Sequence, residues 1–279
     1  MDEDHTGTLW AGGPNAACLN RFDREKEKFT RFVHDPKNPH SLSNGGVNSI
    51  YEDHTGTLWV GTSYGLNKFD REKEQFTRYL YDPKDSTSLH GYSVYSIYED
   101  RRGTLWIGTG RWLNKFDREK EQFTYYAHDP ENPPNRSARP ITAIFEDRAG
   151  TLWVGSEGAG LKKFDRETGQ FTPFFHDPKD LHSLSSDSVR AIFEDRFGTL
   201  WIGTWGGLNR FEREQEHFTH FNHDPKDPHS LSDNVIWSIY EDRSGILWVG
   251  TLGGGVNKFD RGKEQFTKVA QDPDNPHSL

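Results

Sequence analysis

The sequence has little cysteine, no excess of positive charge and no long apolar run, and each absence excludes a class of protein. Its 279 residues include one cysteine, Cys18, so a disulfide within the chain is excluded. The 34 Lys and Arg against 43 Asp and Glu give a formal net charge of −9. No basic stripe accompanies this balance, which argues against a nucleic-acid partner. No stretch approaches the length of a membrane-spanning helix, and the start Met1–His5 is not a secretory signal.

Aliphatic residues are also sparse, because the apolar set makes up only 32% of the chain while Phe, Trp and Tyr alone make up 14%. The core is therefore expected to be built mainly from aromatic rings, each of which buries a large area. The 27 glycines and 14 prolines fit many short strands joined by turns.

One segment of the chain is written six times. The tryptophans of its Leu-Trp pair follow one another at spacings of 49, 47, 47, 48 and 47 residues. A fixed period of this size predicts stacked supersecondary units. The pairs are Leu9/Trp10, Leu58/Trp59, Leu105/Trp106, Leu152/Trp153, Leu200/Trp201 and Leu247/Trp248.

Each copy has the pattern of four short strands. In the third copy these are Val94–Asp100, Thr104–Thr109, Trp112–Asp117 and Gln122–Ala127, and Gly103 supplies the left-handed conformation that the first tight turn needs. Glycines and β-branched residues interrupt every apolar helix face, which excludes a helical solenoid. Six such units predict an all-β fold, a six-bladed β-propeller of four-stranded antiparallel sheets.

We expect a single β-propeller domain over residues 1–279. The first copy retains only the tail of its innermost strand, Met1–Asp4, and Leu279 stops before another such strand begins. One blade is therefore expected to lack its innermost strand, which neighbouring repeats or self-association would complete. The predicted repeats run over about 1–46, 47–93, 94–140, 141–188, 189–235 and 236–279.

Two stretches of the repeat carry a family resemblance. The segments Ser238–Gly255 (SIYEDRSGILWVGTLGGG) and Phe218–Ser232 (FTHFNHDPKDPHSLS) resemble the two-component regulator propeller repeat. This resemblance implies the extracytoplasmic (periplasmic) sensor region of a bacterial hybrid two-component system. Many members of that family regulate polysaccharide use, so it also implies an oligosaccharide or other small ligand.

Positions that are alike in all copies serve what every blade does, which is to fold. The tryptophans and the Glu-Asp pairs, such as Glu99 and Asp100, are therefore interpreted as structural. Neighbouring carboxylates on a strand point to opposite faces, so the pair cannot converge on one substrate atom. The sequence shows no nucleophile motif, phosphate loop or metal-ligand cluster, and we predict no catalytic residue, no metal, no cofactor and no enzymatic activity.

Positions that differ between copies are the candidates for function. They are the residue before Ser/Ala-Ile in the innermost strand and residues of the turn between the second and third strands. Antiparallel connectivity places both sets at the same end of their blades. Aromatic rings beside arginines suit a sugar ring and its carboxylate or sulfate. The candidate ligand-binding residues are Asn48, Tyr64, Tyr95, Arg111, Trp112, Thr142, Glu157, Arg190, Trp205 and Trp237.

Two other functions remain open on the sequence alone. Leu66–Thr77 and Leu113–Thr124 are identical, which indicates recent duplication or deliberate design. The chain could thus be a structural scaffold whose variable positions have drifted without selection by a ligand. A propeller lyase is the other alternative, and it needs a metal or a unique general base that the sequence does not reveal.

Overall fold

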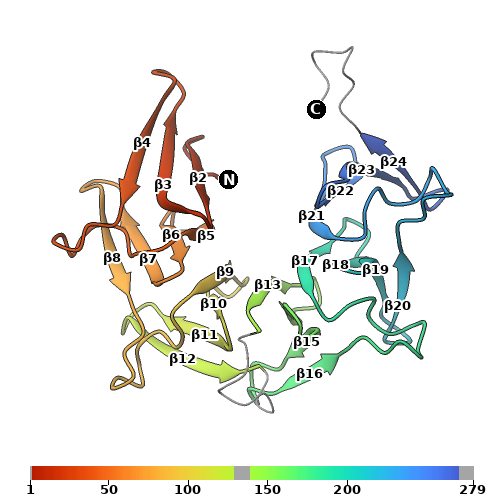
Figure 1. The fold of residues 1–279 in the computed structure, drawn as a ribbon. Helices are drawn as coiled ribbons and strands as arrows, with labels where there is room; N and C mark the ends of the chain where they lie inside the picture. Colours follow the sequence, from red (N-terminus) through yellow and green to blue (C-terminus); the bar gives the residue numbers. More distant parts are fainter. Residues whose placement is uncertain (1, 129–138, 270–279) are drawn as a thin grey trace. The chain divides into compact units, whose positions relative to one another are not determined.

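The structure is a computed structural model that describes residues 2–128 and 139–269, and these residues form strands and turns without any helix. The described part of the chain consequently has no helix that is long and apolar enough to cross a membrane. The strands form six four-stranded antiparallel sheets, and within each sheet they follow one another in chain order (Figure 1). The fold is a six-bladed β-propeller, as the sequence predicts.

The chain divides into two compact units, residues 1–144 and 145–279, and the boundary falls inside β13. The first three sheets comprise β1 (Asp2–Glu3), β2 (Leu9–Gly13), β3 (Ala16–Asp23) and β4 (Lys28–Val33); β5 (Val47–Glu52), β6 (Leu58–Thr62), β7 (Gly65–Asp70) and β8 (Gln75–Tyr79); and β9 (Val94–Glu99), β10 (Leu105–Thr109), β11 (Trp112–Asp117) and β12 (Gln122–Ala127). The last three comprise β13 (Ile141–Glu146), β14 (Leu152–Ser156), β15 (Leu161–Phe164) and β16 (Phe171–Phe174); β17 (Val189–Glu194), β18 (Leu200–Thr204), β19 (Gly207–Glu212) and β20 (His217–Phe221); and β21 (Ile236–Glu241), β22 (Leu247–Thr251), β23 (Gly255–Asp260) and β24 (Gln265–Val269).

The first sheet differs from the prediction in one detail. Its innermost strand is not missing but shortened, because β1 contains only Asp2 and Glu3, which pair with Trp10 and Leu9 of β2. The tight turn predicted at Gly103 is confirmed, with a φ of 76° that a glycine adopts without strain.

Aromatic rings join neighbouring sheets within each unit. The Trp59 ring meets the Phe116 ring of the following sheet edge to face at a centroid distance of 5.3 Å, and Phe116 contacts Phe123 at 4.9 Å. Edge-to-face contacts of this kind add to the free energy gained by burial alone. The same packing recurs in both units, in the pairs Trp10–Phe69, Trp153–Phe211 and Trp201–Phe259.

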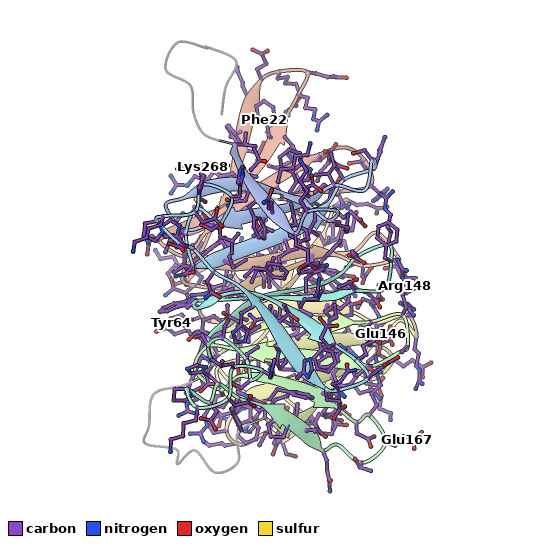
Figure 2. All side chains as sticks on the ribbon, turned by 90° about the vertical axis from the view of Figure 1, so that its right-hand side faces the viewer. Phe22, Tyr64, Glu146, Arg148, Glu167 and Lys268 are labelled. Carbon is purple, nitrogen blue, oxygen red and sulfur yellow. The ribbon has the colours of Figure 1, made fainter. Side chains whose placement is uncertain are left out.

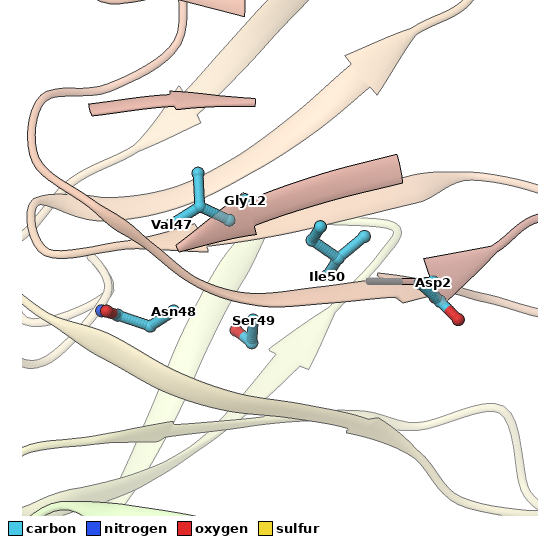
Figure 3. Close-up of a pocket in the computed structure, with 6 residues that line it drawn as sticks. All are labelled: Asp2, Gly12, Val47, Asn48, Ser49 and Ile50. Carbon is cyan, nitrogen blue, oxygen red and sulfur yellow. The ribbon is translucent and has the colours of Figure 1, made fainter. Parts of the chain in front are cut away.

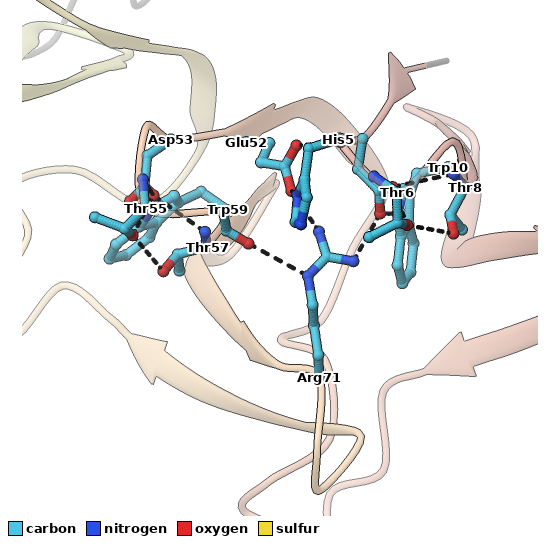
Figure 4. A network of polar contacts seen from close by, with 12 residues as sticks. His5, Thr6, Thr8, Trp10, Glu52, Asp53, Thr55, Thr57, Trp59 and Arg71 are labelled. Atoms are coloured by element: carbon cyan, nitrogen blue, oxygen red, sulfur yellow. Dashed lines mark hydrogen bonds and ion pairs between the residues drawn. The ribbon is translucent and has the colours of Figure 1, made fainter.

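Carboxylates of successive Glu-Asp pairs form a polar clamp between sheets (Figure 4). Asp4 Oδ2 accepts hydrogen bonds from Trp10 Nε1 at 2.8 Å and from Arg71 Nη1 at 2.6 Å, and Arg71 belongs to the following sheet. The other arm of Arg71 donates to Glu52 Oε1 at 2.6 Å, and Glu52 Oε2 accepts the backbone N–H of His5. Asp4 and Glu52, one carboxylate from each of two successive Glu-Asp pairs, are thus held by the same arginine, which supports their structural interpretation.

The clamp recurs along the chain. Its Asp-Trp bond is present in all six sheets, and its arginine reaches back to the preceding aspartate in Arg118–Asp53, Arg213–Asp147 and Arg261–Asp195. Burial alone would raise the pKa of Asp53, but hydrogen bonds from Thr55, Trp59 and Arg118 lower the pKa to about 2. The charged carboxylate is therefore part of the folded structure.

The clamp makes the stability of the fold depend on pH in the acidic range. Because the pKa of Asp53 is lower in the folded chain than the usual value of about 3.9, its contribution is fully present above pH 4 or so and is lost as the pH falls toward about 2. We expect the free energy of unfolding, measured by urea titration, to fall over this range. Asp53→Asn cannot titrate at this position, so it should lose less stability between about pH 5 and 2 than the wild type does. Equal losses would contradict this role.

Candidate functional site

The variable position of the innermost strand is a β-bulge. In the second sheet Val47 pairs with Thr62 and Ser49 pairs with Gly61, so Asn48 is an extra residue without a partner in the ladder. A bulge turns its side chain out of the regular alternation, and bulges are frequent beside binding sites. The register shift falls in the same way on Tyr95, Arg190 and Trp237.

In the second unit, two bulge residues and two turn residues come together. The Arg190 guanidinium carbon lies 4.8 Å from the centroid of the Trp237 ring and 5.8 Å from that of Trp205. Arg190 Nη2 also forms an ion pair with Glu157 Oε2 at 3.0 Å. Four of the ten candidate residues, from three consecutive sheets, therefore form one cluster.

The cluster combines exposed aromatic rings with an arginine that lacks one hydrogen-bond partner among the described residues. Trp205 is 44% exposed and Trp237 is 52% exposed, so both rings are accessible to a ligand. Arg190 Nε is buried and has no hydrogen-bond partner among the described residues. A buried donor without an acceptor costs free energy. The arrangement suits a ring that stacks on indole and carries an anionic or polar group.

The backbone around the cluster fixes the two turn residues. The Trp205 N–H donates to the carbonyl of Ser188 at 3.0 Å, and Glu157 forms an isolated bridge with the same Ser188. A Cβ on Gly206 would lie 2.4 Å from the carbonyl oxygen of Ser185, so only glycine permits this close approach. Ser188, just before β17, therefore holds both Trp205 and Glu157 close to Arg190.

The candidates of the first unit differ in their surroundings. Asn48 Nδ2 donates to the carbonyl of Val94 at 3.0 Å, which gives it a structural contact, and Asn48 also lines an open pocket beside Gly12 (Figure 3). Tyr64 is 55% exposed and lies at the surface (Figure 2). Tyr95, Arg111 and Thr142 are half-buried.

Trp112 belongs to an aromatic group that sequence reasoning missed. The His90 ring stacks on Tyr125 at 3.8 Å with an interplanar angle of 12°, and it meets Trp112 edge to face at 4.5 Å. Tyr81 contacts both His90 and Tyr92. The sequence carries a signal for this group, because His90 occupies the place of a serine in the other described copies.

The repeat itself identifies the family. The sequence profile described as two component regulator propeller matches residues 41–64, 88–111, 135–158, 183–206 and 230–253, each covering an innermost strand and the following strand with its turn. The chain belongs to the two component regulator propeller family. No curated protein matches this propeller chain.

Several solved structures resemble this propeller. The extracellular domain of BT3049 from B. thetaiotaomicron, described as a hybrid two component system, is 26% identical with a TM-score of 0.80 over 100% of this chain. The extracellular domain of BT4673 from the same organism is 22% identical with a TM-score of 0.53 over 94% of this chain. Virginiamycin B lyase from Staphylococcus aureus is 15% identical with a TM-score of 0.66 over 97% of this chain.

The solved structures differ in the share of their own length that this chain covers. The propeller chain spans 35% of the BT3049 structure, 40% of the BT4673 structure and 84% of the lyase. At 22% and 15% identity, the BT4673 and lyase structures share the fold alone with this chain. The propeller therefore resembles extracellular domains of two component systems and corresponds to a part of them.

Proposed function

We propose that this chain is a non-enzymatic, extracytoplasmic ligand-binding module of a two component system, and that it binds an oligosaccharide at the Arg190 cluster. The observation that carries the proposal is the placement of the Arg190 guanidinium against two exposed indole rings, Trp205 and Trp237. The ligand would stack a sugar ring on one indole, and a carboxylate or sulfate of the ligand would bond to Arg190.

Internal comparison supports the choice of this cluster over a site made of repeated residues. The clamp carboxylates and tryptophans occur in every sheet and already bond to each other, whereas each member of the cluster is specific to its copy. A ligand needs one site rather than six equal ones. The family membership and the extracellular relatives support the extracytoplasmic location.

A panel of neutral and uronic-acid oligosaccharides, examined by thermal shift and then by calorimetry, tests this function. For a ligand found in the panel, we expect the double variant Trp205→Ala/Trp237→Ala to bind about a hundredfold more weakly, because two aromatic anchors are lost. Arg190→Gln should weaken the uronic-acid ligands more than the neutral ones.

Tyr240→Ala is the matched control, since Tyr240 is an exposed aromatic residue of the same unit outside the cluster. It should leave the affinity unchanged. If no oligosaccharide of the panel binds although the protein is folded, the result favours the scaffold alternative. Equal losses in Tyr240→Ala and in the double variant would contradict a site at Arg190.

A further inference from the structure

The turn between β17 and β18 carries an exposed aromatic ring. The ring belongs to Phe197, which is 70% exposed. A phenyl ring left in water contributes nothing to the core, so folding does not explain this departure from the repeat. At the same place of the turn the other copies have smaller or charged residues, namely Thr6, Thr55, Arg102, Ala149 and Ser244.

The phenylalanine also gives up a hydrogen bond that this turn makes in other copies. In the second copy Thr55 Oγ1 donates to Asp53 Oδ1 at 2.5 Å. In the fifth copy the backbone N–H of Phe197 still donates to Asp195 Oδ1 at 2.9 Å, but a phenyl ring cannot supply the hydroxyl. The exposed ring therefore replaces a residue that would serve the turn better.

Arginines lie beside the ring. The guanidinium carbon of Arg261 is 5.1 Å from the centroid of the Phe197 ring. Arg196 precedes Phe197 in the turn, and Arg148 Nη1 donates to the carbonyl of Arg196 at 2.7 Å. These contacts bring three arginines of the second unit to one exposed ring.

Two of these arginines face solvent, whereas their carboxylate partners are buried. The side chain of Arg148 is 54% exposed and that of Glu194 is 5% exposed, and for Arg196 and Glu241 the fractions are 41% and 7%. Arg196 reaches Glu241 with Nε and the carbonyl of Asp242 with Nη2, and its Nη1 bonds to no described residue. The surface around the ring is therefore cationic.

We propose that Phe197, Arg148 and Arg196 form a docking site for an acidic segment of a partner protein. An apolar side chain of the segment would pack on Phe197, and its carboxylates would form charge-assisted hydrogen bonds with the two arginines. One exposed ring offers too little apolar area to hold a membrane surface. The first two copies lack this combination, since they have His5 and His54 at the place of Arg196 and threonine at the place of Phe197.

The docking site lies at the other end of its sheet from the Arg190 cluster. Phe197 is in the turn before β18, whereas Trp205 is in the turn after it. The two sites therefore act separately, and Phe197→Ser should leave the affinity for an oligosaccharide unchanged. Failure of one proposal leaves the other standing.

The test is a fluorescently labelled peptide of four Glu-Glu-Leu repeats, added to the full chain at about pH 8, where a histidine is neutral. We expect saturable binding by fluorescence anisotropy. Four Glu-Glu-Ser repeats should bind about tenfold more weakly, because they lack the apolar contact, and four Lys-Lys-Leu repeats should not bind. Raising NaCl from about 50 mM to about 500 mM should weaken binding at least about tenfold, because salt screens exposed charges.

Substitutions by residues that other copies have at these places preserve the turn. Phe197→Ser restores a hydroxyl beside Asp195, and Arg196→His is expected to keep a bond to Glu241, as His5 bonds to Glu52. Each variant should bind the Glu-Glu-Leu peptide at least about tenfold more weakly, with an unchanged midpoint of urea unfolding.

Leu181→Ser is the control, since Leu181 is an exposed apolar residue in the loop after β16 of the same unit. It should leave peptide binding unchanged. Absence of saturable binding, equal binding of the Glu-Glu-Ser peptide, or undiminished binding by Phe197→Ser would overturn the proposal. A clear loss of stability in Phe197→Ser would give the ring a structural role and also overturn it.

Two further measurements separate the partner protein from other occupants. Self-association of the chain that Phe197→Ser abolishes would assign this surface to a second copy. Binding to phosphatidylglycerol vesicles that the same variant abolishes would assign it to a membrane. Either result would overturn the proposal.

Discussion

Trp153→Ala is expected to lower the free energy of unfolding by about 3–5 kcal/mol. Trp153 is fully buried, and its ring contacts Phe211 edge to face at 5.2 Å and Phe174 at 5.9 Å. The substitution also leaves Asp147 without the hydrogen bond from Trp153 Nε1. The loss therefore combines a cavity with one lost hydrogen bond to a buried carboxylate, which keeps its bond from Arg213. Urea titration of the variant and the wild type measures it.

Trp205→Ala is the matched control for this prediction. Trp205 lies in the same unit but is 44% exposed, so its removal should cost about 1 kcal/mol or less. A large loss in both variants would place Trp205 in the folding core and weaken the proposed ligand site. Small losses in both would contradict the role given to the repeated tryptophans.

Asp53→Ala is expected to lower the free energy of unfolding by about 3 kcal/mol. The side chain of Asp53 is buried, and it accepts bonds from Trp59 Nε1 at 2.7 Å and from Arg118 Nη1 at 2.6 Å. Removing the carboxylate leaves the buried indole N–H of Trp59 and Nη1 of Arg118 without their acceptor, while Nη2 of Arg118 keeps Glu99. The change also opens the link between two sheets, since Arg118 belongs to the following one.

Asp70→Ala provides the comparison for Asp53 within the same sheet. Asp70 caps an exposed turn by accepting the backbone N–H groups of Glu72 and Lys73. Its loss should cost only about 1 kcal/mol, as for other exposed caps. Thermal unfolding of the two variants side by side distinguishes the clamp from a general effect of losing an aspartate. Similar shifts in both would contradict the clamp.

The repeat made the fold predictable. The Leu-Trp pairs fixed the period, and the predicted strands Trp112–Asp117 and Gln122–Ala127 coincide with β11 and β12. Short strands with aromatic and β-branched residues between glycine turns have few alternative structures. The structural role of the Glu-Asp pairs was also predicted, because a feature that is present in every copy has to serve every blade.

The candidate site was predictable as a list of positions but not as an arrangement. Comparison of the copies found Arg190, Trp205, Trp237 and Glu157, yet nothing in the sequence showed that these four contact one another. The bulge could not be predicted from the sequence either, since it depends on the register of two strands and not on the residue at the bulge.

By itself the sequence determined the period, the strands, the aromatic core and the family, because these follow from local patterns that repeat along the chain. Only the tertiary structure decided which arginine reaches which aspartate, which variable residues form the Arg190 cluster, and that Gly12 faces an open pocket. The physical reason is that most of these contacts join residues of different sheets. Their distances depend on how one sheet packs on the next, which no local pattern specifies.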